Sequence, residues 1–175
     1  MTAIPTLSTG RLLLRAPRPA DFEGYAEFYA SERSVWEDGP LPRAAAWAEF
    51  AAAAGGWVLR GFGPFSVEEK ATGAYLGEVG LYQPPHYPEP ELGWILVGAA
   101  EGRGIAEEAA RTVRAWAYAT LGLATLVSYI APGNLRSIRL AERLGAVADP
   151  EARSSSPDAG VWRHPGPGVL AEALA

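Results

Sequence analysis

Residues Glu91–Ala146 read ELGWILVGAAEGRGIAEEAARTVRAWAYATLGLATLVSYIAPGNLRSIRLAERLGA, and this stretch decides the fold. The runs ELGWILV and LATLVSYIA are mostly apolar, which is typical of buried strands. Between them, apolar residues recur at helical spacing from Ile105 to Ala117, and the helix should end near Gly122. NLRSIRLAERLG predicts another helix that ends at Gly145. A strand, a helix and a second strand in this order predict a parallel pair with a right-handed crossover.

The segments outside this stretch predict further strands and helices. PFSVEE, AYLGEVGLYQ and ELGWILV are separated by the turns KATG and PPHYPEP, which indicates an antiparallel meander. Before them we expect a strand over 12–15, a helix over 21–30, and a helix from about 43 to 54 that ends at the glycines 55 and 56. GVWRHPG predicts a last short strand. The fold class is therefore α/β (α+β), with a mixed, mostly antiparallel central sheet flanked by helices.

Length and composition narrow the class of protein. The 175 residues, 49% apolar and 20% charged, predict a single folded domain over 1–175. The absence of cysteine excludes disulfides, thiolate metal sites and an acyl-cysteine. A net charge of -5 argues against nucleic acid as a partner. No apolar run is long enough for a signal peptide or a membrane span, so we expect a cytoplasmic protein with no membrane partner.

The turn GRGIA, Gly102 to Ala106, follows a strand and opens the long helix. Small residues let a ligand approach the backbone, and the free N–H groups of a helix start favour an anion such as phosphate. An ordinary tight turn is the alternative. The dinucleotide fingerprint does not fit because Glu107 stands at its third small position, and no nucleotide-triphosphate loop is present. Nicotinamide and ATP are therefore disfavoured.

A second helix start follows the next strand. Asn134 is suited to cap that helix, and Ser137 lies in its first turn. By themselves these residues indicate only a helix cap. Because two adjacent parallel strands present both helix starts at their carboxyl ends, the two starts together predict a ligand site at that edge of the sheet.

These motifs carry a family resemblance. The stretch quoted first, with GRLLLRAPRPAD and EEKATGAYLGEVGL, resembles the core of the GNAT superfamily of acyl-CoA N-acyltransferases. Within it, the sequence is similar to the branch of ribosomal-protein N-terminal alanine and serine acetyltransferases. The likeness runs from about Gly10 to Gly145. It implies an acetyl-CoA site in the V-shaped gap of a splayed parallel strand pair, with no metal.

The resemblance also implies roles for individual residues. Backbone groups near Leu96 and Val97 would pair with the pantetheine arm, and an N–H near Val97 would stabilise the thioester oxyanion. Asn134 would bond the pantetheine, and Ser137 would return a proton to the CoA thiolate. The backbone N–H groups of the turn would hold the pyrophosphate; they belong to Gly102, Arg103, Gly104, Ile105 and Ala106.

Two carboxylates depart from the family pattern. Glu101 stands where Arg, Gln or an aromatic residue is expected, and Glu107 stands where Thr is usual. Each would oppose a bound pyrophosphate, by about 1 kcal/mol per charge pair at roughly 4 Å in water. Four arginines near the two helix starts are candidates to offset this repulsion, and only Arg103 is placed by the motif itself; the others are Arg136, Arg139 and Arg143. The alternative is that they form a solvated helix face.

An amine must lose a proton before it attacks a thioester, so a carboxylate should assist. Glu78 is the first choice because antiparallel pairing about PPHYPEP sets it beside Ile95; the alternative is a solvent-facing strand residue. Glu37 and Asp38 are rivals in a loop that shapes the acceptor pocket in this family. The neighbouring tryptophans, Trp36 and Trp47, are more often core.

The two histidines give no sign of a metal site, since they lie far apart in sequence. His86 should be exposed in a loop, and His164 should decorate the last strand.

The resulting hypothesis is an acetyl-CoA-dependent N-acetyltransferase that transfers the acetyl group directly to a primary amine. The acceptor is a protein N-terminus or a small molecule; antibiotics, amino acids and polyamines are all acetylated by similar scaffolds. Two other classes stay open: a non-catalytic CoA-binding or sensory module, and an interaction protein that binds no CoA. A homodimer is consistent with the resemblance.

Overall fold

A computed structural model describes residues 3–172 of the chain. Its eight-stranded sheet has the order β1-β2-β3-β4-β5-β6-β8-β7. The strands are β1 (Leu7–Ser8), β2 (Leu12–Arg15), β3 (Pro64–Glu69), β4 (Tyr75–Tyr82), β5 (Glu91–Leu96), β6 (Val127–Ile130), β7 (Val147–Ala148) and β8 (Gly160–Arg163). The helices are α1 (Phe22–Ala30), α2 (Arg43–Leu59), α3 (Ile105–Leu121), α4 (Leu135–Arg143) and α5 (Pro167–Glu172). All strand pairs are antiparallel except β5 with β6, so the predicted fold class is confirmed.

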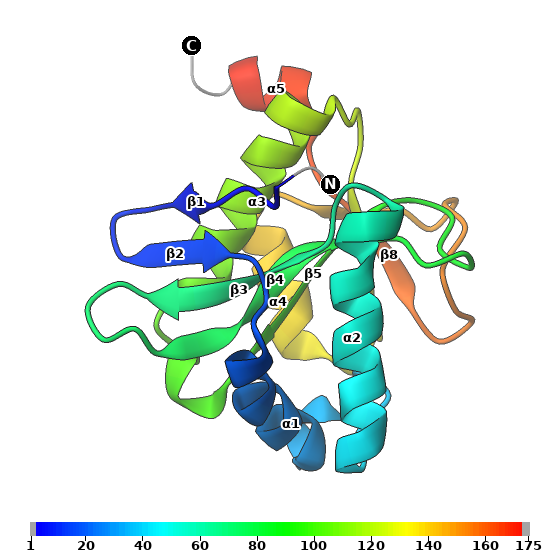
Figure 1. Cartoon of the computed structure of the whole chain (residues 1–175). Helices are drawn as coiled ribbons and strands as arrows, with labels where there is room; N and C mark the ends of the chain where they lie inside the picture. Colours follow the sequence, from blue (N-terminus) through cyan, green and yellow to red (C-terminus); the bar gives the residue numbers. More distant parts are fainter. Residues whose placement is uncertain (1–2, 173–175) are drawn as a thin grey trace.

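The sheet separates two layers of helices. Helices α1 and α2 lie together against one face, while α3 and α4 lie behind the other (Figure 1). Alternation along β5 explains the division, because Leu92 belongs to the core under α3, whereas Ile95 packs with the aromatic cluster of α1 and α2.

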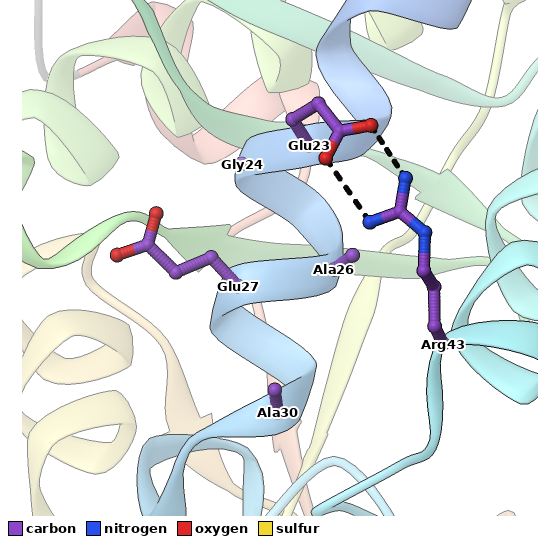
Figure 2. Close-up of a pocket in the computed structure, with 6 residues that line it drawn as sticks. All are labelled: Glu23, Gly24, Ala26, Glu27, Ala30 and Arg43. Atoms are coloured by element: carbon purple, nitrogen blue, oxygen red, sulfur yellow. Dashed lines mark hydrogen bonds and ion pairs between the residues drawn. The ribbon is translucent and has the colours of Figure 1, made fainter.

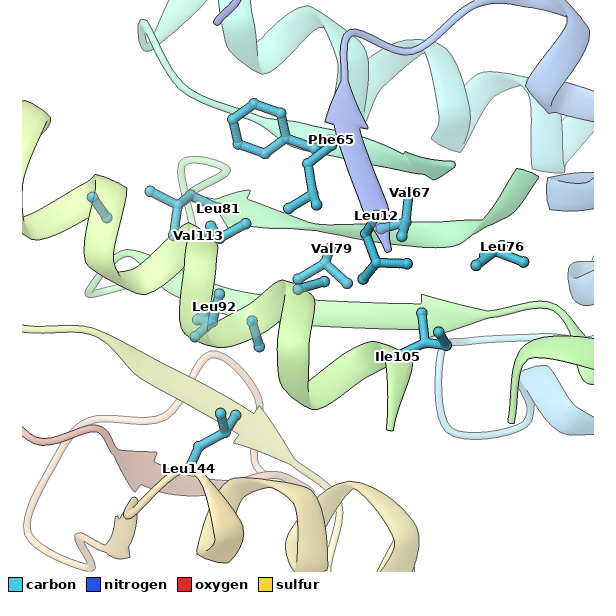
Figure 3. Close-up of a cluster of buried hydrophobic side chains, with 14 of the residues drawn as sticks. Leu12, Phe65, Val67, Leu76, Val79, Leu81, Leu92, Ile105, Val113 and Leu144 are labelled. Carbon is cyan, nitrogen blue, oxygen red and sulfur yellow. The ribbon is translucent and has the colours of Figure 1, made fainter. Parts of the chain in front are cut away.

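The main core lies between the sheet and α3. Ile105 and Val113 of α3 are buried against strand residues such as Val79, Leu81 and Leu92 (Figure 3). Their spacing is the apolar face predicted for this helix. Packing therefore holds the start of α3 at a defined place on the sheet edge, which positions the turn before it.

Helix α2 is longer than the sequence indicates. It continues through Gly55 and Gly56, where we expected it to stop, and ends at Leu59. Trp57 explains the extension, since its ring packs edge-on against Phe65 and its Nε1 donates to the Pro64 carbonyl oxygen at 2.7 Å. This buried anchor outweighs the low helix propensity of the glycines, roughly 1 kcal/mol each.

A bulge in β4 decides which side chains face α1. Between Val67 and Glu68 of β3 the register with β4 shifts by one residue at Gly77, whose φ is +136°. A side chain at Gly77 would begin 2.2 Å from the Ile95 carbonyl oxygen, so only glycine fits. Beyond the bulge, Glu78 pairs with Ile95 in the register predicted from the loop centre.

The downstream strands follow the prediction with one difference. The parallel strand covers only Val127–Ile130 rather than the whole apolar run 123–131. The last strand, β8, forms within GVWRHPG as expected and pairs with β6. Between residues 3 and 172, no helix has the length and apolar character that crossing a membrane requires.

Candidate functional site

A hollow of about 340 Å³ lies at the start of α3. It brings together five of the eight residues predicted to bind CoA: Leu96, Gly102, Gly104, Ile105 and Ala106. Ala100, Glu107 and Arg143 complete its lining. The predicted turn is therefore the wall of a concave surface at the end of β5.

The backbone of this turn is suited to an anion. Gly102 and Gly104 have φ values of +69° and +73°, a conformation that side chains disfavour. Gly104 caps α3 without a side-chain acceptor. Within residues 3–172, the N–H groups of Gly102, Arg103 and Gly104 have no protein acceptor. Free N–H groups and the positive end of the α3 dipole thus face the same hollow.

The two acidic residues beside the turn are neutralised by arginines. Glu101 forms ion pairs with Arg33 and Arg136, and although desolvation opposes them, these bonds lower the pKa of Glu101. Glu107 is bonded by Arg111 at 2.8 Å, which lowers its pKa, and by Arg143 at 3.0 Å. Both carboxylates are therefore held as charged partners of arginine.

Arg103 does not have the neutralising role expected of its side chain. It forms an ion pair with Glu69 of β3, away from both carboxylates that flank the turn. Its carbonyl oxygen accepts a hydrogen bond from Arg11 at 2.8 Å. Glu69, a strand residue distant in sequence, holds the guanidinium instead of Glu101 or Glu107.

The end of β5 presents Leu96, rather than Val97, to the gap beside β6. The Val97 N–H donates to the Leu76 carbonyl oxygen of β4 at 3.0 Å, so it is not free to stabilise an oxyanion. Backbone groups alternate between the two edges of a strand, so those of Leu96 and Trp94 face the gap. The Leu96 carbonyl oxygen accepts from Arg33 Nη2 at 2.8 Å.

Side chains interrupt the parallel ladder and splay β5 from β6. The Val127 N–H donates to the Pro90 carbonyl oxygen at 3.2 Å, and a regular ladder would next join Tyr129 to Leu92. Instead, the Tyr129 N–H donates to Glu91 Oε1 at 3.1 Å, and Ser128 Oγ donates to the Leu92 carbonyl oxygen at 2.6 Å. Strand pairing therefore ends at Glu91 and Val127.

His164, the residue directly after β8, supports this splayed junction. Its Nε2 lies 3.0 Å from Ser128 Oγ, and its Nδ1 lies 3.4 Å from Arg114 Nη1. The ring is only 2% exposed, so it is buried rather than on the strand surface as expected. Burial, with Arg114 nearby, lowers the pKa of His164 to about 3. The neutral ring therefore links Ser128 of β6 to Arg114 of α3.

The start of α4 faces β5 across the gap. Asn134 caps the helix as predicted, because its Oδ1 accepts from the Ser137 N–H at 3.2 Å. Ser137 Oγ accepts a hydrogen bond from Trp94 Nε1 at 3.2 Å. Sequence reasoning missed Trp94, since its apolar ring in a strand gives no sign of a polar partner. The hydroxyl hydrogen of Ser137 is left to donate elsewhere.

A strap formed by residues 31–42 runs between α1 and α2 and crosses both sides of the gap. Arg33 bonds the end of β5, as described above. Trp36 packs on Gly133, just after β6, where a side chain would begin 2.4 Å from the ring. Trp36 is 47% exposed, so it belongs to the strap rather than to the core. Trp47 is equally exposed and packs edge-on against Phe22.

Glu78 lies on the sheet face that α1 and α2 cover. It is 2% exposed, and its Oε1 has no hydrogen-bond partner within residues 3–172. Burial, and then the negative charge of Asp21, raise the pKa of Glu78 to about 8. It is therefore not a solvent-facing strand residue. The structure places an unpaired titratable group beside Ile95, near the end of β5.

Of the two rival carboxylates, Asp38 is exposed and Glu37 is half-buried. Burial raises the pKa of Glu37 to about 8, helped by the charges of Glu91 and Asp38. Burial also raises the pKa of Glu91 to about 7, against the bond from Tyr129. Glu91 begins β5, at the end of the strand opposite Leu96. His86 is exposed in the preceding loop.

Another hollow, about 460 Å³, lies along α1 and contains none of the predicted residues. Figure 2 shows that an ion pair between Glu23 and Arg43 borders it. Among residues 3–172 there is no cluster of three acidic, histidine or cysteine side chains arranged to hold a metal ion.

Comparison with known proteins identifies the class. Residues 11–147 match the family model of the acetyltransferase (GNAT) domain, so the chain belongs to the GNAT acetyltransferase family. The crystal structure of an acetyltransferase from Agrobacterium tumefaciens str. C58 is 42% identical and superposes with a TM-score of 0.89, covering 94% of this chain and 96% of that one. The predicted family resemblance is confirmed.

Two further comparisons are more limited. A putative ribosomal-protein-serine acetyltransferase from Vibrio cholerae is 23% identical over 95% of this chain and all of that one, with a TM-score of 0.75, which shows a shared fold. The uncharacterized protein YkkB of Bacillus subtilis (strain 168) is 34% identical over 80 residues. This match spans 45% of the chain and 46% of YkkB, somewhat less than half of each.

Proposed function

We propose that this protein is an acetyl-CoA-dependent N-acetyltransferase that acts on a primary amine. The observation that carries the proposal is the meeting of the unpaired N–H groups at the α3 start with the splayed edge of β5 in one hollow. Membership of the family indicates acyl transfer. The choice of acceptor depends on the residues of this particular chain. A single domain, a cytoplasmic location and a homodimer stay predictions.

The residues around the hollow fit the parts of acetyl-CoA. The N–H groups of the turn from Gly102 to Ala106 would hold the diphosphate, since a side chain at either glycine would be strained and would narrow the approach. Arg103 would contribute its backbone only. Asn134 at the start of α4 would bond the pantetheine arm. Acetyl-CoA supplies the activated acetyl group as a thioester.

Arg33 occupies part of the pantetheine path. It donates to the Leu96 carbonyl oxygen, which the pantetheine amide would need. Binding would therefore displace Arg33 from that oxygen while its bond to Glu101 holds it nearby. We assign the oxyanion contact to the Leu96 N–H, because the Val97 N–H is already bonded to β4.

The transfer needs one group to remove a proton and another to supply one. Glu78 would take the proton of the attacking amine, directly or through water, as a new C–N bond forms and the C–S bond breaks. Ser137 would give its proton to the departing thiolate, with its oxygen held by Trp94. A pKa of about 8 suits Glu78 to this role near neutral pH, where a base must accept and release protons readily.

Binding and turnover test the proposal separately. Isothermal titration with acetyl-CoA should give micromolar affinity, and thiol release with a panel of amines should detect transfer. Binding without transfer to any amine would favour a non-catalytic CoA-binding module. No binding of acetyl-CoA would refute both and favour an interaction protein.

A further inference from the structure

Three carboxylates differ from the other acids in this protein. Among residues 3–170, Glu37, Glu78 and Glu91 are the only buried or half-buried carboxylates without an ion pair. By contrast, Glu101 and Glu107, beside the hollow at the start of α3, both form ion pairs with arginines. Removing a carboxylate from water without a cationic partner is costly, so the burial of these three glutamates requires a reason.

Two of them, Glu78 and Glu91, belong to what we call the acceptor face, the side of β4 and β5 that also carries Tyr82 and Ile95. Glu78 pairs with Ile95, and Tyr82 pairs with Glu91, so the two glutamates stand at opposite ends of this face. The two positions on β5 are four residue steps apart, about 13 Å along the strand. Glu78 lies at the end of this face near Leu96, where the acetyl group is expected. Glu91 lies at the far end, where β5 begins.

Between these glutamates, the acceptor face carries two glycines and a tyrosine. Gly80 and Gly93 form the strand pair between them, and neither carries a side chain. A Cβ atom built on Gly93 would lie 3.0 Å from the Tyr82 ring and 3.7 Å from the Glu91 carboxyl carbon. Both side chains therefore lie over Gly93. An aromatic ring between two carboxylates favours a cationic chain, since its face attracts positive charge.

The strap adds a third carboxylate, the half-buried Glu37. Glu37 feels the charge of Glu91, and burial with this charge raises the pKa of Glu37 to about 8. The pKa of Tyr82 is raised well above its ordinary value by burial and then by several nearby charges, with Glu78 the strongest and Glu91 among the others. Tyr82 pairs directly with Glu91 across the two strands. A bound cation would favour the charged forms of Glu37 and Glu91.

We infer that the acceptor carries a second positive charge beyond the amine that is acetylated, and that Glu37 and Glu91 hold this second charge while Glu78 faces the reacting nitrogen. This inference rests on the proposed function. The two nitrogen atoms should lie roughly 6–11 Å apart, allowing for the reach of each carboxylate along the strand. A linear diamine or polyamine has this chemistry, and so does a peptide whose N-terminal amine is followed by a basic side chain.

The test compares amines that differ only in the second charge. Acetylation kinetics are measured with alkyl diamines of graded length, alkyl monoamines of the same length, and dipeptides with lysine or norleucine in the second position. We expect diamines in the stated range to exceed their monoamines roughly tenfold or more in kcat/KM. A preference seen only among the dipeptides would identify a peptide N-terminus as the source of the two charges.

Variants test whether Glu37 and Glu91 cause the preference for diamines. Glu37→Gln and Glu91→Gln should each reduce the ratio of diamine to monoamine kcat/KM several-fold; glutamine at 91 keeps the oxygen that accepts from Tyr129. Glu151→Gln, which removes an exposed carboxylate, should leave the ratio unchanged. Titration with CoA confirms that each variant is folded.

The outcomes separate this inference from the proposed function. Equal activity on monoamines and diamines, or a preference that survives both substitutions, overturns the inference and leaves the acetyltransferase assignment intact. If no amine is acetylated, the proposed function fails and the inference fails with it. Binding of a diamine to the CoA-bound protein, lost in Glu91→Gln, would support the inference by a readout other than turnover.

Discussion

Trp94 Nε1 donates a hydrogen bond to Ser137 Oγ across the gap between β5 and α4, over 3.2 Å. The bond joins the two elements that would enclose the thioester. It also directs the hydroxyl hydrogen of Ser137 away from Trp94, because the oxygen already accepts there. Trp94 is therefore expected to position Ser137 for donation to the thiolate.

Ser137→Ala should lower kcat roughly tenfold to a hundredfold with little change in the affinity for acetyl-CoA. Trp94→Phe keeps an aromatic ring and removes only the donor, so we expect a several-fold decrease in kcat. In the Ser137→Ala background, Trp94→Phe should cost nothing further, since the two act through one proton. An equal loss in both backgrounds would show that Trp94 acts through packing alone.

Gly104→Ala should weaken CoA binding more than it weakens folding. A side chain at φ +73° is strained by roughly 1–2 kcal/mol and would crowd the turn at the diphosphate. Gly122→Ala is the matched control, because Gly122 has φ +67° at the other end of the same helix. Isothermal titration with CoA and thermal unfolding compare the two; similar Kd values in both variants would argue against a diphosphate at the turn.

Glu101→Gln should strengthen CoA binding several-fold at low salt. The change removes one negative charge near the expected diphosphate and frees Arg136 and Arg33 to approach it. The gain should shrink at high ionic strength, since exposed charges are screened. Titrations at two salt concentrations measure it. Weaker binding in the variant would mean instead that Glu101 is needed to hold one of these arginines in place.

The Glu78 carboxyl should appear in the pH dependence of activity. Because its pKa is about 8, the basic form becomes dominant only above that pH, so kcat/KM should rise until about pH 8 and then level off. Glu78→Gln should lower kcat/KM and remove this inflection. If the variant keeps the wild-type profile, Glu78 is not the base and the attacking amine titrates alone.

Glu78 should also affect stability, with a definite sign. Its folded pKa lies above the ordinary value of 4.5, so its contribution to stability is complete below that value and is lost as the pH rises through about 8. Denaturant unfolding between these pH values should show a steady decline in the free energy of unfolding. Glu78→Gln should flatten that decline.

His164 should cause the opposite trend in acid. Its folded pKa of about 3 lies below the ordinary 6.5, so the stability it contributes is complete above pH 6.5 and is lost as the pH falls through about 3. His164→Asn should be less stable at neutral pH but should depend less on pH in this range. His86→Asn, at an exposed position, serves as the control. The same pH dependence of stability in the wild-type protein, His164→Asn and His86→Asn would contradict the prediction.

Much of this protein is determined by local sequence. The helix that begins at Ile105, the cap at Asn134 and the meander that sets Glu78 beside Ile95 all depend on periodicity, turn residues and short loops. These features act over a few residues and are legible in the chain itself. They suffice to predict the sheet, its parallel pair and the turn at its edge.

Only the tertiary structure decided how the charges are distributed. Arg33 meets Glu101 across 68 positions of sequence, and Glu91 takes the Tyr129 N–H across 38. The same long-range folding captures Arg103 at Glu69 and leaves Glu37, Glu78 and Glu91 without arginine partners. No local pattern encodes these contacts, because pairing between charges depends on which side chains the packed core brings together, and that is settled by the burial of residues elsewhere.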